Sequence, residues 1–165
     1  MKKMKNDNKG FTLVELIVVL VILAILAAIL VPALLGYIDD ARNKQLEIHG
    51  KSVYTAAQAT ATKFYGKGKS ATNGTDQVNG KTYVETVQEL AEMESAFPDG
   101  TVAVVYFNKD TTDTNASKNW TLAGIKYTEN SVSIYYKPGD DAEWKDWPAS
   151  DPFGSNYVAV SIAKP

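Results

Sequence analysis

The stretch that decides the fold is residues 9–38, which reads KGFTLVELIVVLVILAILAAILVPALLGYI. After Glu15 no charged residue follows until Asp39, so residues 16–38 form one uncharged run. An α-helix rises ~1.5 Å per residue, and ~20 apolar residues are enough to cross the hydrocarbon layer of a bilayer. Leu, Ile, Val and Ala would cover such a helix on all sides, which excludes the amphipathic helix of a soluble protein, whose apolar residues lie on one face. The stretch therefore predicts a membrane-spanning helix.

Glu15 interrupts the apolar segment close to its beginning. An ionised carboxylate at the middle of a membrane helix costs roughly 2.5–3.5 kcal/mol on insertion scales, and such a group usually has a partner. Near a helix N-terminus the cost falls, because the helix dipole favours negative charge there. The residues alone leave two interpretations open: a tolerated acid at the helix start, or a group that pairs with a cation.

Charge is distributed unevenly along the chain. Four lysines and one aspartate give residues 1–10 a net charge of +3, whereas the whole chain carries −2. A short basic leader before an apolar run predicts a cytoplasmic N-terminus and translocation of the remainder. An ordinary signal peptide, cut near Ala28 or Ala33, is an alternative, although its apolar region should be ~7–15 residues long and free of acids. An uncut single-pass anchor is another.

Residues 9–15, KGFTLVE, followed by the long apolar run, resemble the processing signal of type IV pilins and the related pseudopilins. In that family a membrane-embedded aspartyl peptidase cuts after the glycine and then N-methylates the new first residue. The resemblance covers about the first third of the chain. It implies cleavage between Gly10 and Phe11, N-methylation of Phe11, and a role for Glu15 in subunit assembly.

The same resemblance implies a set of partners and a location. The partners are further copies of the chain in a helical filament, the prepilin peptidase, a membrane platform with an assembly ATPase, and the lipid bilayer before assembly. The chain would first be a single-pass membrane protein and then part of an extracellular pilus. A pseudopilin of a type II secretion system, a competence pilin for DNA uptake and a membrane-tethered sugar- or protein-binding module remain alternatives. Contact with a host surface or with DNA stays unassigned.

Pro32 and Gly36 lie within the predicted helix. Proline removes a backbone hydrogen bond and clashes with the preceding turn, so a kink or a loosened turn is expected near residues 31–32. The family resemblance implies that the helix loosens there in a filament. Cysteine is absent, so the head must rely on its core. Many pilins of Gram-negative bacteria carry a C-terminal disulfide, and its absence favours a Gram-positive pilin.

The sequence divides into four segments: a basic leader (1–10), the apolar assembly half of the helix (11–38), its amphipathic half (39–65) and a globular head (66–165). An apolar stripe with helical spacing begins near the end of the first half and continues through the second, and the helix is expected over residues 13–65. The members of this stripe are Leu35, Ile38, Leu46, Val53, Ala57 and Phe64.

The head reads as a mixture of loops, one short helix and several strands. Residues 66–80 are polar and glycine-rich, which predicts a loop, and residues 83–97 predict a short helix. Runs rich in β-branched and aromatic residues predict strands at 101–107, 120–127, 131–136 and 157–163, with a tight turn at Glu129-Asn130. The predicted fold class is α+β, with the long helix packed on an antiparallel sheet, which is also the pilin architecture.

No catalytic constellation is present in the sequence. His49 is the only histidine and is expected to be a surface or partly buried helix residue, so we predict neither an enzyme nor a bound cofactor. Residues 137–155 are rich in acids, and a calcium site is one interpretation of them. The favoured interpretation is a solvated acidic loop held to the sheet by Trp144, Trp147 and Phe153, because the spacing matches no EF-hand. The calcium candidates are Asp140, Asp141, Asp146 and Asp151.

Overall fold

The computed structural model describes residues 10–108, 121–139, 141 and 143–165. The leader, apart from Gly10, therefore lies outside the described residues, as does the start of the strand predicted at 120–127. The chain forms two compact units, Met1–Arg42 and Asn43–Pro165, which are described separately. Helix α1 (Leu13–Gly66) contributes to both, and its bounds agree with the predicted helix to within one residue.

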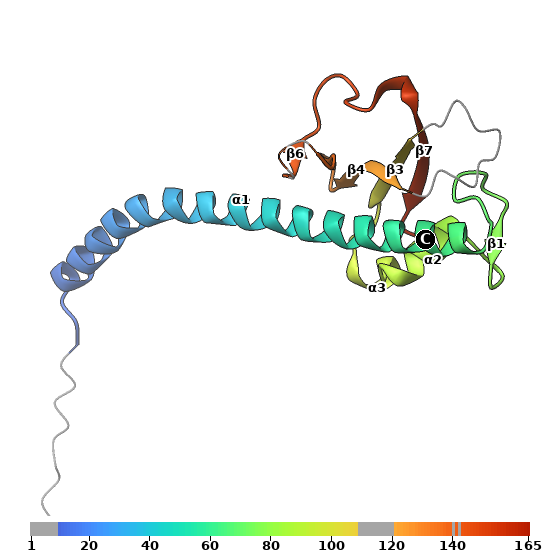
Figure 1. Ribbon diagram of the computed structural model, residues 1–165. Coiled ribbons are helices and arrows are strands. Elements are labelled where there is room, and N and C mark those ends of the chain that lie inside the picture. Colours follow the sequence, from blue (N-terminus) through green and yellow to red (C-terminus); the bar gives the residue numbers. More distant parts are fainter. Residues whose placement is uncertain (1–9, 109–120, 140, 142) are drawn as a thin grey trace, which may run out of the picture. The chain divides into compact units, whose positions relative to one another are not determined.

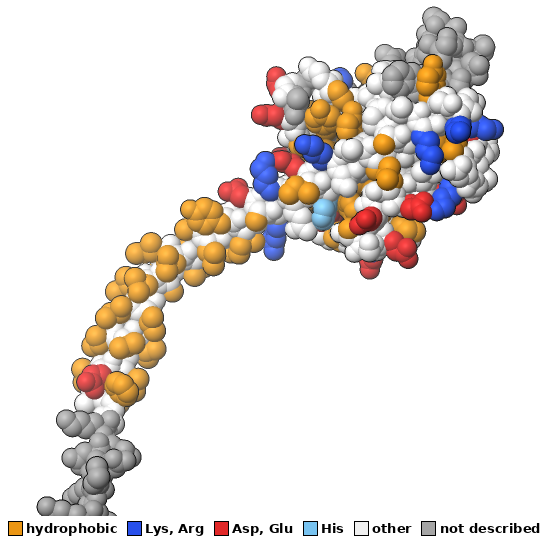
Figure 2. Space-filling model, turned by 60° about the horizontal axis from the view of Figure 1, so that its bottom comes forward, with side chains coloured by type: hydrophobic (Ala, Val, Ile, Leu, Met, Phe, Trp, Pro, Cys, Tyr) orange, Lys and Arg blue, Asp and Glu red, His pale blue; other side chains and the backbone are white. Residues whose placement is uncertain are grey.

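In the first unit, helix α1 exposes its side chains over the whole of residues 13–42. Figure 2 shows hydrophobic side chains gathered along this part of the helix. Its most apolar window has a mean hydropathy of 3.3, so by length and composition the helix could cross a membrane. The helix continues through Pro32 and Gly36 without interruption. Loosening of this turn in a filament stays a prediction.

The second unit contains a five-stranded antiparallel sheet with the strand order β6-β5-β4-β3-β7 (Figure 1). The strands are β3 (Val102–Asn108), β4 (Leu122–Glu129), β5 (Val132–Tyr136), β6 (Lys145–Asp146) and β7 (Tyr157–Ala163). Four of them lie within two residues of a predicted strand at each end. Strand β6 falls in the segment predicted as an acidic loop, and it pairs with Ile134 and Tyr135 of β5.

Three details of the head correct the sequence-based expectations. The predicted helix at 83–97 is two helices, α2 (Tyr83–Leu90) and α3 (Met93–Ala96), because Glu92 adopts a left-handed conformation with φ 55°. The predicted loop at 66–80 contains strand β1 (Gln77–Val78), which pairs with β2 (Lys81–Thr82). The hairpin turn is Asn130-Ser131, with φ of 49° and 68°, whereas Glu129 still pairs with Val132. Positive φ at both residues suits the twist of a two-residue hairpin.

The core lies between the second half of α1 and the inner face of the sheet. Val53, Ala57 and Phe64 of the predicted stripe are completely buried, and Leu46 is 7% exposed. Figure 1 shows the sheet on one side of this part of α1 and helix α3 on the other, whereas Gln88 of α2 donates a hydrogen bond to the Ala163 carbonyl of β7. The α+β fold, with the helix packed on an antiparallel sheet, is therefore confirmed. The fully buried residues of the sheet are Ala103, Val105, Phe107, Ile125, Tyr127 and Ile162.

We expect Gly124→Ala to lower the free energy of unfolding by about 1–3 kcal/mol, the usual cost of overfilling a packed site. A Cβ at this position would lie 2.5 Å from both Cζ of Phe153 and the carbonyl oxygen of Tyr136. The ring of Phe153 cannot easily move, because it stacks on Tyr106 at 4.0 Å. Chemical denaturation of the full chain in micelles measures the effect. Gly66→Ala is the matched control, since a Cβ there meets nothing within 4 Å, and equal stability of the two variants would contradict the prediction.

Candidate functional site

The candidate site is the start of helix α1, where the backbone and side chains of two residues form a closed hydrogen-bonded pair. The Thr12 hydroxyl accepts a hydrogen bond from the Glu15 backbone N–H at 3.2 Å. In return, Oε2 of Glu15 accepts hydrogen bonds from the Thr12 N–H at 2.8 Å and from its hydroxyl at 2.7 Å. This is a capping box, which satisfies N–H groups that the first helical turn leaves unpaired.

The capping box explains how the helix tolerates an acid within its apolar sequence. The carboxylate lies in the first turn, where the positive end of the helix dipole also favours it. A carboxylate has about four lone-pair positions, so Glu15 keeps acceptor capacity for a further donor. The threonine three residues before the glutamate is a recognisable capping signature, and sequence reasoning missed it.

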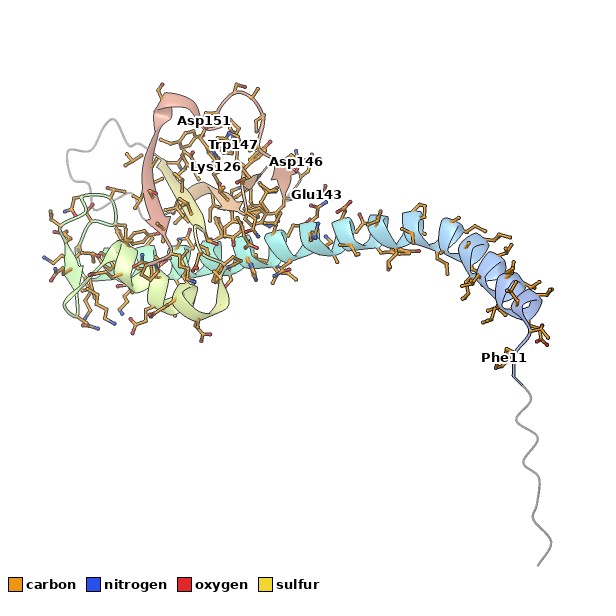
Figure 3. The ribbon with its side chains drawn as sticks, turned by 180° about the vertical axis from the view of Figure 1, so that it is seen from behind. Phe11, Lys126, Glu143, Asp146, Trp147 and Asp151 are labelled. Carbon is orange, nitrogen blue, oxygen red and sulfur yellow. The ribbon has the colours of Figure 1, made fainter. Side chains whose placement is uncertain are left out.

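Phe11 and Gly10 precede this capped turn. Phe11 is 84% exposed, and Figure 3 shows it at the start of the helix. Among the described residues, a Cβ added to Gly10 would meet no heavy atom within 4 Å. Packing within this part of the chain therefore gives no reason for a glycine there. A requirement of another protein that acts on this segment would explain the glycine.

A shallow apolar hollow surrounds the capped acid. Its volume is about 600 Å³, and apolar surface greatly exceeds polar surface in its lining. Such a surface at the beginning of an exposed apolar helix is suited to contact with lipid or with another helix. The lining residues are Phe11, Val14, Glu15, Leu16, Val18 and Val19.

The acidic residues of the head do not converge within the described part of the chain. Asp141 lies 3.5 Å from the Lys145 ammonium, and Asp151 accepts a hydrogen bond from the Phe153 N–H at 2.9 Å. Asp146 belongs to β6, and Asp140 lies outside the described residues. The described residues contain no group of three His, Cys, Asp or Glu side chains placed to hold a metal ion. Calcium binding stays an untested alternative to the favoured interpretation.

The aromatic residues of the same segment hold it against the sheet, as expected. Phe153 is 3% exposed, and Trp144 packs against Tyr136 with ring centroids 5.5 Å apart. The Lys126 ammonium lies 4.2 Å from the centroid of the Trp147 ring (Figure 3). The two tryptophans therefore pack against neighbouring side chains of the sheet rather than extending freely into solvent.

A buried polar contact between α1 and β4 was also missed. His49 is partly buried, with 17% of its side chain exposed, and its Nδ1 lies 2.8 Å from Oε2 of Glu129. The same oxygen accepts a hydrogen bond from the Tyr127 hydroxyl at 2.5 Å. Burial and this carboxylate raise the pKa of Tyr127, so its hydroxyl keeps the proton that it donates. The contact joins residues 80 positions apart, a separation that local patterns do not predict.

Comparison with known proteins adds one finding. A family model described as the prokaryotic N-terminal methylation motif matches residues 5–31. No curated protein and no solved structure matches the chain. The matched segment contains Gly10, Phe11 and the capped Glu15. It supports a type IV pilin-like prepilin signal, as found in pilins and pseudopilins, at the N-terminus of this chain.

Proposed function

We propose that this protein is a structural subunit of an extracellular type IV pilus, assembled by helix packing after its leader is removed and Phe11 is N-methylated. The observation that carries the proposal is the capped Glu15 within the methylation motif, at the start of a helix whose apolar side chains are exposed. The filament would serve adhesion, surface motility or aggregation. The role is structural and not enzymatic.

The proposed cleavage solves an electrostatic problem at the helix start. Removal of residues 1–10 leaves a positively charged α-amine on Phe11, beside the apolar hollow. Neither this amine nor the Glu15 carboxylate is stable when desolvated alone, but the amine of one subunit can pair with the carboxylate of the next. Leaving one member of a buried pair uncompensated costs about 3–5 kcal/mol, so the pair selects the register of the subunits.

Apolar contact between helices supplies most of the proposed attraction. Removing apolar surface from water contributes roughly 25 cal/mol per Å². Lipid is already apolar, however, so transfer from the bilayer into the filament gains little from this effect. Extraction from the membrane therefore requires work, which an assembly ATPase and its membrane platform would supply. We assign residues 11–38 to assembly, 39–65 to the amphipathic half of the helix, and 66–165 to the head.

The absence of cysteine supports a Gram-positive filament, because the head lacks the disulfide of many Gram-negative pilins. The second candidate function is a pseudopilin of a type II secretion system or a competence pilin. The methylation motif favours it as much as it favours a pilus, since these proteins share the signal. Deleting the chain distinguishes them: loss of surface fibres supports the pilus, whereas loss of protein export or DNA uptake supports the alternative.

Mass spectrometry of protein sheared from the cell surface tests the proposal directly. We expect the mature N-terminal peptide to begin with N-methylated Phe11, because the peptidase would cut after Gly10. Gly10→Leu is the control and should leave the uncut chain in the membrane. A mature chain that begins at Met1 or near Ala28, or an unchanged N-terminus in the Gly10 variant, would contradict the assignment.

A further inference from the structure

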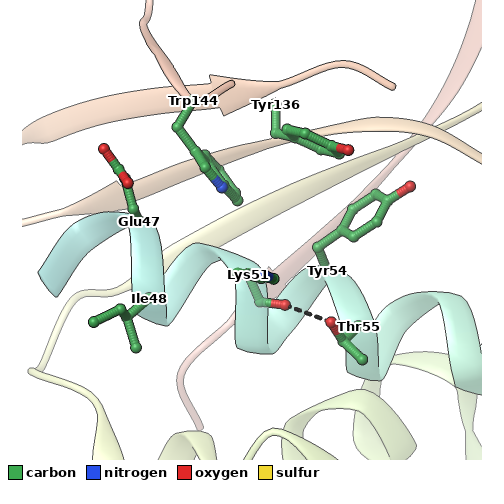
Figure 4. A pocket seen from close by; sticks show the side chains of 7 residues that line it. All are labelled: Glu47, Ile48, Lys51, Tyr54, Thr55, Tyr136 and Trp144. Carbon is green, nitrogen blue, oxygen red and sulfur yellow. Dashed lines mark hydrogen bonds between the residues drawn. The ribbon is translucent and has the colours of Figure 1, made fainter. Parts of the chain in front are cut away.

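A second concave site lies in the head, within residues 43–165, and the mechanism above does not use it. It is a pocket of about 420 Å³ between α1 and the edge of the sheet formed by β5 and β6 (Figure 4). This volume lies in the range of ~300–1,000 Å³ that is typical of small-molecule sites. The lining residues are Glu47, Ile48, Lys51, Tyr54, Thr55, Tyr136 and Trp144.

Three aromatic side chains from three segments form one wall of the pocket. The rings of Tyr54 and Tyr136 meet edge to face with centroids 5.2 Å apart, and the Trp144 ring lies 5.5 Å from that of Tyr136. Figure 4 shows the three in a row above α1. All three are only partly buried, so ring surface remains accessible from the pocket.

The sequence of α1 makes room for this wall. Gly50 lies in the helix interior, where glycine costs about 1 kcal/mol relative to alanine. A Cβ at this position would lie 2.6 Å from Cη2 of Trp144. The pairing of β6 with β5 fixes Trp144 from its other side, because Lys145, the next residue, pairs with Tyr135. The tryptophan is therefore held in place by regular elements on both sides.

The polar groups of the pocket are balanced in charge and varied in hydrogen-bonding character. One carboxylate, Glu47, and one ammonium, Lys51, are the charged side chains in the lining. Glu47 is already paired with Lys44, whose ammonium lies 2.8 Å away. The Thr55 hydroxyl donates to the Lys51 carbonyl at 2.8 Å, which leaves its oxygen free to accept. Burial and the neighbouring Tyr136 raise the pKa of Tyr54, so its hydroxyl stays a donor at neutral pH.

We propose that the pocket bounded by Trp144, Tyr136 and Tyr54 binds a ring of a neutral oligosaccharide. A pyranose has a face of C–H groups and a rim of hydroxyls. The C–H face complements the negative face of an aromatic ring, and the rim needs donors and acceptors at the side. The aromatic wall and the groups on α1 provide both. Because the lining carries one charge of each sign, it selects neither an anion nor a cation. The inference goes beyond the proposed filament and does not depend on it.

Saturation-transfer NMR on the full chain, in micelles of a detergent without a sugar head group, tests the inference. The probes are maltotriose, cellotriose and triacetylchitotriose, with sorbitol as a polyol without a ring and trigalacturonic acid as an anionic sugar. We expect transfer to the ring C–H protons of at least one neutral trisaccharide. Absence of transfer to all three up to their solubility limits, or stronger binding of the anion, would overturn the proposal.

Variants then locate the binding. Trp144→Ala should raise the dissociation constant of the sugar about tenfold, in line with the energy of one aromatic contact. Trp147→Ala, which removes a tryptophan that does not line the pocket, should leave it unchanged. Lys51→Ala should weaken sugar binding severalfold, and Lys63→Ala, on the same helix but outside the pocket, is its control. Both lysines are exposed, so comparison of these two variants tests the proposal even if Trp144→Ala fails to fold. Unchanged binding in Lys51→Ala and in a folded Trp144→Ala would overturn the proposal.

A second copy of the chain in the pocket would also overturn the proposal. It would be seen as concentration-dependent self-association in place of sugar binding.

Discussion

Replacing Glu15 by alanine is expected to leave removal of the leader intact and to abolish filament assembly. The proposed scissile bond between Gly10 and Phe11 lies several residues before Glu15, so the peptidase would still have its recognition sequence. In the filament, however, each Phe11 amine would be buried without a carboxylate. At about 3–5 kcal/mol per uncompensated charge, incorporation should become at least ~100-fold less favourable. Immunoblots of sheared and membrane fractions, with mass spectrometry of the mature N-terminus, measure both steps.

The control for this experiment must separate pairing from helix capping, because Glu15 caps the helix and, in the proposed mechanism, would also pair with the amine. Thr12→Ala removes the hydroxyl of the capping box and costs the helix about 0.5–2 kcal/mol, but it keeps the carboxylate. We expect this variant to assemble, with reduced yield. Glu15→Gln keeps a side-chain acceptor without the charge and should fail as Glu15→Ala does. Normal fibres from Glu15→Ala, or equal failure of Thr12→Ala, would contradict the pairing mechanism.

Much of the fold follows from local patterns in the sequence. The long helix was predicted because its composition and its apolar stripe extend over many turns, and Gly66 ends it within one residue of the expected position. The longer strands were predicted because β-branched and aromatic residues are concentrated in them. The membrane-spanning prediction rests on the uncharged run of residues 16–38 and needs no tertiary information.

The errors arise where tertiary contacts decide the local structure. Helix 83–97 breaks at Glu92, which allows the next residue, Met93, to be completely buried in the core. Strand β6 has two residues, which is too short for an alternating pattern, and it exists because β5 offers an edge. At the candidate site, Gly10, Phe11 and Glu15 all lie within residues 10–15 and are readable as one local motif. The aromatic wall of the pocket combines residues from α1, β5 and the segment before β6, so no local pattern contains it.

The second large effect is expected at Glu129, where Glu129→Ala should lower the free energy of unfolding by about 3–5 kcal/mol. Glu129 is 4% exposed and accepts hydrogen bonds from both His49 and Tyr127. A carboxylate only accepts, so Nδ1 of His49 carries the hydrogen. Removing the carboxylate leaves these two donors without their acceptor in the interior, and an unsatisfied buried group costs ~1–3 kcal/mol. Chemical denaturation of the full chain in micelles measures the loss.

A double-mutant cycle with His49→Ala distinguishes pairing from simple loss of volume. Side chains in direct contact usually show coupling of about 0.5–3 kcal/mol, so the double variant should be more stable than the sum of the single changes predicts. Glu94→Ala, an exposed glutamate of α3, is the matched control and should stay within about 0.5 kcal/mol of the parent. Zero coupling would mean that the contact between His49 and Glu129 contributes nothing to holding the helix to the sheet. In that case the buried glutamate would have no structural role beyond its contact with Tyr127.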